Sequence, residues 1–297
     1  MEQLSMKTQH EASSRIKLRA GTSNDRDVCS AIMLEAFSAI NNLHNFSPEF
    51  PDLADWKHMF EVLSSVGYCV VAEMDGRIVG SNFIDERAQV GSVGPISVSP
   101  EVQGNGLGRM LMQAVIDRPR EQKLAEIRLL QASFNFRSLS LYTKLGFEVQ
   151  EPIVAMEGIP LKRRSVPGCT VRPASIADLP AVNTICRKVY GFDRALDMQS
   201  AIQRGDAFAV ERDGRLTGYA TGFGYFSHAV AESNLDMQAL LCAAHKVDGP
   251  GVLIPTRNSE LFRWCLESRM RVVLPYTYMS MGSYAAPQGA FIPSIGF

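Results

Sequence analysis

The chain has 297 residues, more than one ordinary domain holds, so its length indicates about two domains. Hydrophobic residues make up 46% of it and charged residues 21%, which is typical of a soluble globular protein with an ample core. The net charge of −1 excludes a global basic field that would attract nucleic acid or an anionic membrane. Partners must therefore bind at local sites.

The six cysteines are scattered without a C-x-x-C pair, which indicates reduced, mostly buried thiols in a cytoplasmic protein. The five histidines show no H-E-x-x-H spacing, so no metal site is expected. No apolar run approaches the roughly 18 residues of a membrane helix. The segment "MEQLSMKTQHEASSR" lacks a signal-peptide core, so residues 1–15 are expected to form a disordered tail.

The first half of the chain predicts alternating strands and helices, with a hairpin turn at the Asp75-Gly76 dipeptide. The expected elements are a strand at 16–20, a helix at 23–41, a helix within 47–65, strands at 68–73, 77–86 and 91–98, a helix at 106–118, a strand at 125–132, a helix at 136–145 and a strand at 147–156.

The second half repeats the first. "IKLRAGTSNDRDVCSAI" from Ile16 matches "CTVRPASIADLPAVNTI" from Cys169, and each predicts a strand, a Ser/Thr/Asp cap and an amphipathic helix. "EMDGRIVG" matches "ERDGRLTG" at an offset of 138 residues, and a weaker match pairs Asn135 with Asn258 at an offset of 123. The second copy is therefore 15 residues shorter, and we attribute the difference to the glycine loop of the first copy. The repeat indicates two domains of one architecture.

The glycine loop lies in "VSPEVQGNGLGRML" at 98–111, after a strand and before an amphipathic helix. It is not a Walker A motif, because no Gly-Lys-Ser/Thr follows, and it is not a dinucleotide fingerprint, because Arg109 stands where a third glycine is needed. Free amides and the dipole at the helix N-terminus favour an anion such as a pyrophosphate. By itself the loop is equally compatible with a tight turn.

Two motifs together resemble one family. "Gln103-Gly-Asn-Gly106-Leu-Gly108" resembles the Q/R-x-x-G-x-G/A signature of the GNAT superfamily of acetyl-CoA-dependent N-acetyltransferases. The later signature of that family, an asparagine, a small residue and "LY-x-K-x-GF", is similar to Asn135, Ser138 and "LYTKLGF" at 141–147. The resemblance covers residues 16–156.

The resemblance implies an α/β (α+β) fold of two tandem GNAT-type domains, each a mixed, mostly antiparallel sheet flanked by helices. We expect a catalytic domain at 16–156, a linker at 157–168 around "MEGIPLKRRSVPG", and a degenerate GNAT-like domain at 169–297. Acetyl-CoA is the implied acyl donor, with loop amides on its pyrophosphate and a strand edge on its pantetheine arm. The implied cofactor-binding residues are Ile96, Ser97, Val98, Gln103, Gly104, Asn105, Gly106, Leu107, Gly108, Arg109, Asn135, Ser138 and Tyr142.

The resemblance places Tyr142 near the thioester sulfur, as the acid that protonates the departing thiolate. A phenol with a pKa of about 10 suits that role, and the alternative is a core aromatic residue. Glu86, near the end of a strand, is the candidate general base, and the alternative for it is a solvated edge carboxylate. No covalent intermediate is required.

The second half lacks the Gly-x-Gly pattern. Glu232 and Asp236 occupy the corresponding turn, where their charge opposes a pyrophosphate. Cys265 stands at the position of Tyr142. The alternatives for it are a reactive nucleophile and a buried thiol, and we interpret it as a buried thiol. The apolar ending "GAFIPSIGF" predicts a docked segment.

The leading hypothesis is an N-acetyltransferase that acts on a small-molecule primary amine by direct attack in a ternary complex. A non-catalytic acyl-CoA sensor is the alternative, and an acyl group longer than acetyl stays open. We expect no nucleic-acid partner, no membrane and no metal. The chain is expected as a monomer, with its two domains as a pseudo-dimer, or as a homodimer.

Overall fold

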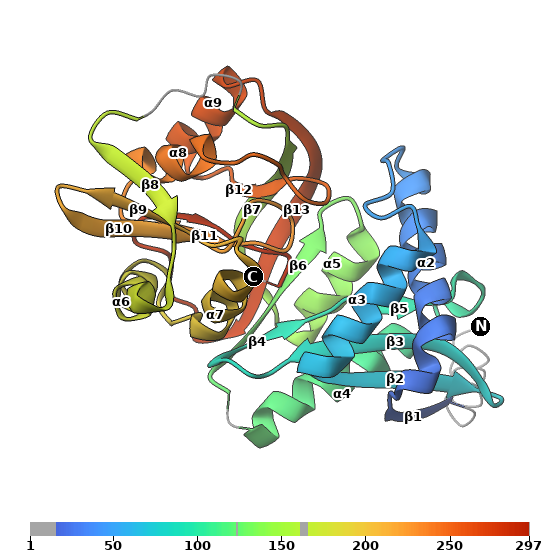
Figure 1. Ribbon diagram of the computed structural model, residues 1–297. Coiled ribbons are helices and arrows are strands. Elements are labelled where there is room, and N and C mark those ends of the chain that lie inside the picture. The colour runs from blue at the N-terminus through green and yellow to red at the C-terminus, as the bar shows by residue number, and fades with distance from the viewer. Residues whose placement is uncertain (1–15, 123, 161–165, 297) are drawn as a thin grey trace. The chain divides into compact units, whose positions relative to one another are not determined.

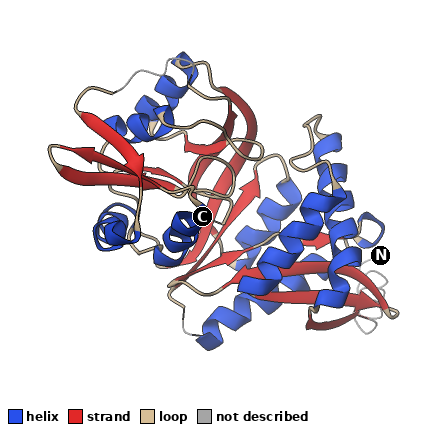
Figure 2. Ribbon diagram, in the orientation of Figure 1, coloured by secondary structure: helices blue, strands red, loops and turns tan. Residues whose placement is uncertain are grey.

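A computed structural model describes residues 16–122, 124–160 and 166–296 (Figure 1). The expected tail at 1–15 and the centre of the expected linker, 161–165, lie outside the described residues. The chain divides into two compact units. Unit 1 contains the residues up to Arg128 together with Arg137–Gly146, and unit 2 contains Leu129–Phe136 together with the residues from Phe147 onward. Both units combine helices with strands (Figure 2).

Unit 1 holds most elements expected of the first half. They are β1 (Ile16–Ala20), the 3-10 helix η1 (Ser23–Asp25), α2 (Arg26–Leu43), α3 (Leu53–Val66), β2 (Tyr68–Met74), β3 (Arg77–Asp85), β4 (Val90–Val93), β5 (Ser97–Val98), the 3-10 helix η2 (Pro100–Val102), α4 (Leu107–Gln122), the first part of β6 (Glu126–Ala132) and most of α5 (Phe136–Leu145). The strand order is β1-β2-β3-β4-β6, antiparallel except for the parallel pair of β4 and β6.

The prediction of a single strand at 91–98 is wrong, because the structure has two strands there. Gly94 has φ +123 and Pro95 has no N–H, so the ladder is interrupted between β4 and β5. β4 pairs with both β3 and β6, whereas β5 lies off that path and pairs with β3. Because of this interruption, β5 does not continue the ladder that β4 forms with β6, and it pairs with β3.

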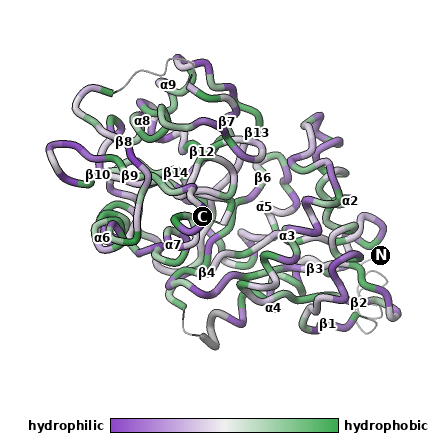
Figure 3. The backbone as a smooth tube through the Cα atoms, viewed as in Figure 1, coloured by the Kyte–Doolittle hydropathy of each residue, from purple (hydrophilic) through white to green (hydrophobic). Residues whose placement is uncertain are grey.

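Helices α2 and α3 pack on β2 and β3 through an aromatic core. Trp56 is 2% exposed and Phe60 1%, and Phe60 meets Phe83 edge to face at a centroid distance of 5.5 Å. The indole N–H of Trp56 donates to the carbonyl of Phe50 at 3.0 Å, which satisfies its one polar atom. On α4, Leu107, Leu111 and Val115 are buried at helical spacing. Helix α4 therefore has one apolar face, whereas consecutive residues of β2 and β3 are buried, so these strands are covered on both faces. Figure 3 shows the hydropathy of each residue along the backbone.

Unit 2 holds the remaining elements. They are β7 (Glu148–Glu157), β8 (Cys169–Pro173), the 3-10 helix η3 (Ile176–Asp178), α6 (Leu179–Tyr190), α7 (Ala195–Arg204), β9 (Phe208–Arg212), β10 (Arg215–Ala220), β11 (Ala229–Ala231), α8 (Asn234–Cys242), β12 (Val252–Pro255), α9 (Ser259–Glu267), β13 (Arg271–Gly282) and β14 (Ala290–Ile292). One antiparallel sheet has the order β14-β11-β10-β9-β8.

Strand β7 explains why the compact units do not follow the two halves of the sequence. In unit 2 the strand path is β6-β13-β7-β12, with β7 antiparallel to both β13 and β12. The first half contributes β6 and β7 to this path, and the second half contributes β12 and β13. Exchanging β6 with β12 and β7 with β13 gives the same order in reverse, so the path is symmetric between the halves. The last long strand of each half therefore lies beside a strand of the other half. The limits 16–156 and 169–297 of the two repeats stay a prediction.

An ion-pair cluster closes the first strand-to-helix turn. Arg19 donates to both carboxylate oxygens of Asp25 at 2.7 and 2.8 Å and to Glu73 at 2.7 Å. The amide of Thr22 donates to the same carboxylate at 2.7 Å in a capping box. These hydrogen bonds to Arg19 and Thr22 lower the pKa of Asp25 to about 2.

The second half has the same cluster. Arg172 donates to both oxygens of Asp178 at 2.9 and 2.8 Å and to Glu211 at 2.9 Å, and Ser175 donates its amide to Asp178 at 2.7 Å. The pKa of Asp178 is likewise lowered to about 2, chiefly by Arg172. The two halves thus share a buried or half-buried contact set as well as an order of elements.

We expect Asp25→Asn to lower the free energy of unfolding by about 2 kcal/mol at pH 7. The folded-state pKa of Asp25 is below its ordinary value, so its contribution is present above about pH 4 and disappears as the pH falls through 2. Urea titrations of wild type and variant at several pH values check this. Asp75→Asn, the same change in an exposed turn, should be near neutral. A pH-independent difference for Asp25→Asn would contradict the assignment.

Candidate active site

The glycine loop joins η2 to α4 in unit 1. Gly104 has φ +92 and Gly106 has φ +79, and a Cβ atom on either would meet nothing within 4 Å. Their requirement for glycine is therefore conformational. Gln103 Nε2 donates to the carbonyl of Val98 at 3.1 Å, and Asn105 Nδ2 donates to the carbonyl of Val102 at 3.4 Å.

The first turn of α4 presents free backbone amides. Its first helical hydrogen bond runs from the amide of Met110 to the carbonyl of Gly106 at 3.1 Å. The amides of Leu107, Gly108 and Arg109 come before it and have no helical acceptor. This turn contains no acidic residue, and residues 103–106 are exposed. The helix dipole adds to the attraction for an anion there.

Beside the loop, β5 has a strand partner on one edge. Val98 faces Gly80 and Ser97 faces Ser81 of β3, and the amide of Ser99 donates to Val79 at 2.9 Å. No strand of the described residues pairs with the other edge of 96–98. That edge can accept an extended chain or a pantetheine arm.

Tyr142 lies on α5 one helical turn after Ser138. Its side chain is buried, at 7% exposure, and hydrogen-bonds with Ser138. Burial raises the pKa of Tyr142, and the hydrogen bond with Ser138 opposes that shift. The phenol therefore keeps its proton at neutral pH. Leu141, its neighbour, lies beside the loop, because a Cβ on Gly108 would meet Leu141 Cδ2 at 3.5 Å.

Asn135 precedes α5 and is counted with unit 2. Its amide donates to the carbonyl of Ala132 at 2.8 Å, and its own carbonyl accepts from Gln131 Nε2 at 2.9 Å. These bonds form the turn from β6 into the helix. The structure thus brings the loop, Val98, Ser138 and Tyr142 into unit 1, and Asn135 belongs to unit 2.

Glu86 is held by an arginine that sequence reasoning missed. Arg118 Nε donates to both of its carboxylate oxygens at 2.8 and 2.9 Å, and the guanidinium lies 4.3 Å from the ring centroid of Tyr68. A general base needs a free oxygen directed at the amine. The base role of Glu86 stays a prediction. No local pattern pairs residues 32 positions apart, so the sequence carried no signal for Arg118.

The corresponding helix start in unit 2 is occupied by its own side chains. Ser233 caps α8 by accepting from the amide of Asp236. Asp236 has no exposed surface and accepts from Arg212 at 2.9 Å and Thr217 at 2.9 Å. Glu232 pairs with Lys188 at 2.9 Å. Carboxylates therefore stand where unit 1 has free amides.

The strand register makes the same comparison for β11. Gly80 faces Val98 in unit 1, and Gly218 faces Ala231 in unit 2. Ala229–Ala231 therefore corresponds to 96–98. Its other edge is covered, because β14 pairs with all three residues. The C-terminal segment is therefore docked, as expected, through the pairing of β14 with β11.

The same register corrects the position of the missing residues. The offset between the halves is 138 residues at Gly218, 133 at Ala231 and 123 at Asn258. The shortening is therefore spread over the connection between the β10 and β11 strands, the helix start and the segment after it. The expectation that the glycine loop accounts for all of it is wrong.

Cys265, at the position of Tyr142, has no exposed surface, and burial raises the pKa of its thiol to about 12. A protonated, buried thiol is a poor nucleophile. Asn258 caps α9 by accepting from the amide of Leu261 and exchanges hydrogen bonds with Asn234. In the second copy, the equivalent of Asn135 therefore forms hydrogen bonds with other groups of the protein.

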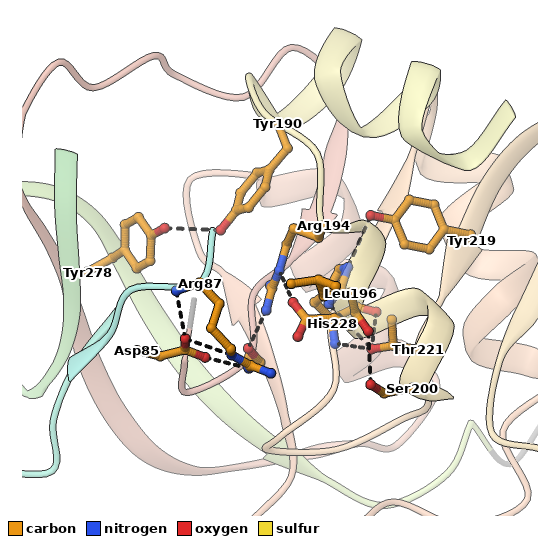
Figure 4. Close-up of polar contacts among 12 residues, drawn as sticks. Asp85, Arg87, Tyr190, Arg194, Leu196, Ser200, Tyr219, Thr221, His228 and Tyr278 are labelled. Atoms are coloured by element: carbon orange, nitrogen blue, oxygen red, sulfur yellow. Dashed lines mark hydrogen bonds and ion pairs between the residues drawn. The ribbon is translucent and has the colours of Figure 1, made fainter. Parts of the chain in front are cut away.

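Unit 2 also contains a buried polar cluster that sequence reasoning missed (Figure 4). His228 Nε2 is 3.0 Å from the hydroxyl of Tyr219, and His228 Nδ1 is 3.3 Å from Thr221 Oγ1. Burial and the charge of Arg194 hold the pKa of His228 well below its ordinary value, so the ring is neutral. Arg194 donates to Asp197 at 2.8 Å. All but Asp197 are buried, so they do not face solvent.

No group of three or more His, Cys, Asp or Glu side chains with the arrangement of a metal site occurs among residues 16–122, 124–160 and 166–296. Within those ranges, no helix has both the length and the apolar character needed to cross a bilayer.

Comparison with known proteins agrees with this geometry. The model of the acetyltransferase (GNAT) family matches residues 33–147. A mycothiol acetyltransferase of Tsukamurella paurometabola is 37% identical over 86 residues, which are 28% of this chain and 30% of that protein. The L-methionine sulfoximine/L-methionine sulfone acetyltransferase of Pseudomonas paraeruginosa is 32% identical over 119 residues, covering 37% of this chain and 69% of that protein.

The fold of the whole chain also has a counterpart. The crystal structure of a putative acetyltransferase from Pyrococcus horikoshii has a TM-score of 0.72 at 20% identity, and the match covers 93% of this chain and 92% of that one. The chain spans about a third of the mycothiol acetyltransferase that it matches and over two thirds of the Pseudomonas enzyme. The resemblance of the loop and of the 135–147 motif is confirmed: the chain belongs to the acetyltransferase (GNAT) family.

Proposed function

We propose that the protein transfers acetyl from acetyl-CoA to a primary amine of a small molecule, by direct attack in a ternary complex. The observation that carries the proposal is the set of free amides at Leu107–Arg109, in the same unit as the open edge of β5 and the protonated Tyr142. A pyrophosphate, an extended arm and a thioester are the three parts of acyl-CoA that such groups suit.

The small acceptor is supported by two relatives, whose names specify acetylation of mycothiol and of L-methionine sulfoximine or sulfone. Transfer to an amine requires its neutral form, and an alkylamine with a pKa of about 10 is mostly charged at pH 7. Turnover should therefore increase with pH until the amine is neutral. The proposal assigns no covalent enzyme intermediate, in keeping with the buried, protonated state of Cys265.

In this mechanism Tyr142 stabilises the departing thiolate. A phenol with a raised pKa is a weaker acid than a thiol, whose ordinary pKa is about 8.5. Tyr142 therefore acts first as a hydrogen-bond donor to the developing negative charge on sulfur, and solvent finally supplies the proton. Ser138 holds the hydroxyl in place on α5.

The second half takes no coenzyme in this proposal. Asp236, tied to Arg212, fills the helix start, and β14 covers the strand edge. An acyl-CoA would have to displace both. We therefore infer one coenzyme per chain and a catalytic role for the first half alone.

Gly106→Ala should weaken CoA binding about fivefold, because an alanine at φ +79 is strained by about 1 kcal/mol and relaxes in the free protein. Calorimetry checks the affinity and the expected stoichiometry of one. Gly76→Ala has the same strain at φ +76 and the same open surroundings, so it should lower stability similarly and leave CoA affinity as in wild type. Equal CoA affinities for the two variants would count against the loop.

Tyr142→Phe should lower kcat roughly 100-fold and leave the Kd for CoA within about twofold, because the hydroxyl acts on the leaving group. Thiol release from acetyl-CoA over a panel of amines gives kcat, and calorimetry gives Kd. Unchanged turnover would remove Tyr142 from the mechanism. CoA binding by wild type without turnover on any amine would favour the non-catalytic sensor.

Glu86→Gln tests the base. Because both oxygens are held by Arg118, we expect a loss of stability of up to about 1 kcal/mol and a fall in kcat/KM of less than about tenfold, with an unchanged pH profile. A fall of roughly 100-fold or more in kcat/KM, with CoA affinity unchanged, would instead establish Glu86 as the general base.

A further inference from the structure

The turn that carries Asn135 is held by a strand from the second half of the sequence. The amide of Ser133 donates to the carbonyl of Pro275 at 3.0 Å, and the hydroxyls of Ser133 and Thr277 share a hydrogen bond of 2.8 Å. Both partners lie on β13, which is next to β6 in the sheet. Asn135 follows two residues after Ser133, directly before α5. Contacts with β13 therefore fix where this turn begins.

Hydrogen bonds inside the turn link Asn135 to the end of β6. The amide of Asn135 donates to the carbonyl of Ala132 at 2.8 Å. Gln131, which is 2% exposed, donates from its side chain to the carbonyl of Asn135 at 2.9 Å. Because Ser133 lies between these linked residues, its placement on β13 also sets the placement of Asn135.

The second half repeats the backbone contact. At the offset of 123 residues, Thr256 corresponds to Ser133 and Pro152 corresponds to Pro275. The amide of Thr256 donates to the carbonyl of Pro152 at 3.0 Å, the same distance as in the first half. Its hydroxyl donates to that carbonyl as well, at 3.3 Å. The contact between the turn and the strand of the other half is thus a property that both halves share.

The position of Thr277 is where the two halves differ. The residue 123 positions earlier is Val154, which has no hydroxyl and packs against the hydrophobic core of unit 2. Valine and threonine are both β-branched and both suit a strand. The fold alone therefore does not require a hydroxyl here. The turn with the candidate coenzyme ligand has a hydroxyl contact that valine could not make at the equivalent turn.

The second half anchors β13 through the neighbours of Thr277. The hydroxyl of Tyr278 lies 3.0 Å from that of Tyr190 on α6 (Figure 4), and Tyr225 donates to the hydroxyl of Tyr276 at 3.0 Å. Tyr276 is 3% exposed and Tyr278 has no exposed surface. Side chains of successive strand residues point to opposite faces, so Thr277 points away from the face of the anchored tyrosines. The second half thus holds the strand in place while Thr277 reaches the turn.

We propose that Thr277 is a positioning residue for the coenzyme: its hydroxyl, supplied by the second half, holds Ser133 so that Asn135 is placed to bind the pantetheine arm of acetyl-CoA. The inference rests on the proposed function, since Asn135 is a coenzyme ligand only under that function. It gives the second half a role that needs no coenzyme of its own, because this half orders a turn of the first.

Thr277→Val introduces the residue that already stands at the equivalent position, Val154. It removes one hydrogen bond to a half-buried hydroxyl, so the Kd for CoA, measured by calorimetry, should rise about threefold. The KM for acetyl-CoA should rise similarly, and kcat should stay within about twofold. Loss of folded protein would instead lower the apparent kcat and leave KM unchanged. Thr277→Ser keeps the hydroxyl and should keep the wild-type Kd.

Ser280→Ala is the matched control on the same strand. Ser280 accepts a hydrogen bond from the side chain of Gln150 at 3.0 Å. Its removal should lower the free energy of unfolding in the same way as Thr277→Val and leave the Kd for CoA unchanged. An equal rise in Kd for both variants would contradict a specific role of Thr277.

Asn135→Ser tests whether Thr277 acts through Asn135. The variant removes the amide and keeps a residue type that is favoured before a helix. Thr277→Val should then add no further loss of CoA affinity. An unchanged Kd for Thr277→Val, an equal rise for Thr277→Ser, or a full threefold effect in the Asn135→Ser background would overturn the inference and leave the proposed function standing. No binding of CoA by wild type would overturn both. The expected pattern of Kd values without acetyl transfer to any amine would support the positioning role and contradict the transferase proposal.

Discussion

The first three amides of an α-helix have no acceptor within the helix, and the two halves of this protein satisfy that requirement in opposite ways. In α4 the amides of Leu107, Gly108 and Arg109 stay open beside an exposed loop. In α8 the cap Ser233 and the buried Asp236 take the same place. An unsatisfied donor group costs free energy in the absence of a ligand or water. The first half therefore leaves these amides available for a ligand, and the second half satisfies the corresponding helix start with its own side chains.

The strand edges follow the same rule. The edge at 96–98 has no strand partner in the described chain, whereas Ala229–Ala231 pairs with β14. Both edges begin from the same close contact, since a Cβ on Gly80 would be 2.6 Å from the Ser97 carbonyl and one on Gly218 would be 2.9 Å from that of Val230. The scaffold is thus held constant while the groups that a coenzyme would use are either left free or covered.

What is common to the halves is structural. Arg19 with Asp25 and Arg172 with Asp178 close the same turn with nearly the same distances. Such a cluster holds the first strand to its helix whatever happens at the far end of the sheet. The differences lie at the starts of α4 and α8 and at the edges of β5 and β11. A fold retained with its ligand groups replaced is what a duplicated domain with one remaining active site would display.

The sequence by itself determined most of the elements and the family, and it predicted the repeat. Local signals carried these: Asp-Gly turns, helical periodicity, a glycine pattern before a helix and "LYTKLGF" after it. It did not reveal the break at Gly94-Pro95 or the pairing of Glu86 with Arg118. It also did not reveal that β7 and β13 each lie beside a strand of the other half. The ion pair and the strand order depend on residues that are distant along the chain, where partner choice is decided by register and packing. The break at Gly94-Pro95 is local, and its Gly-Pro signal was overlooked in the sequence. Only the tertiary structure decided that β14 covers an edge and that Leu141 lies beside Gly108, because both are contacts between segments that no local pattern links.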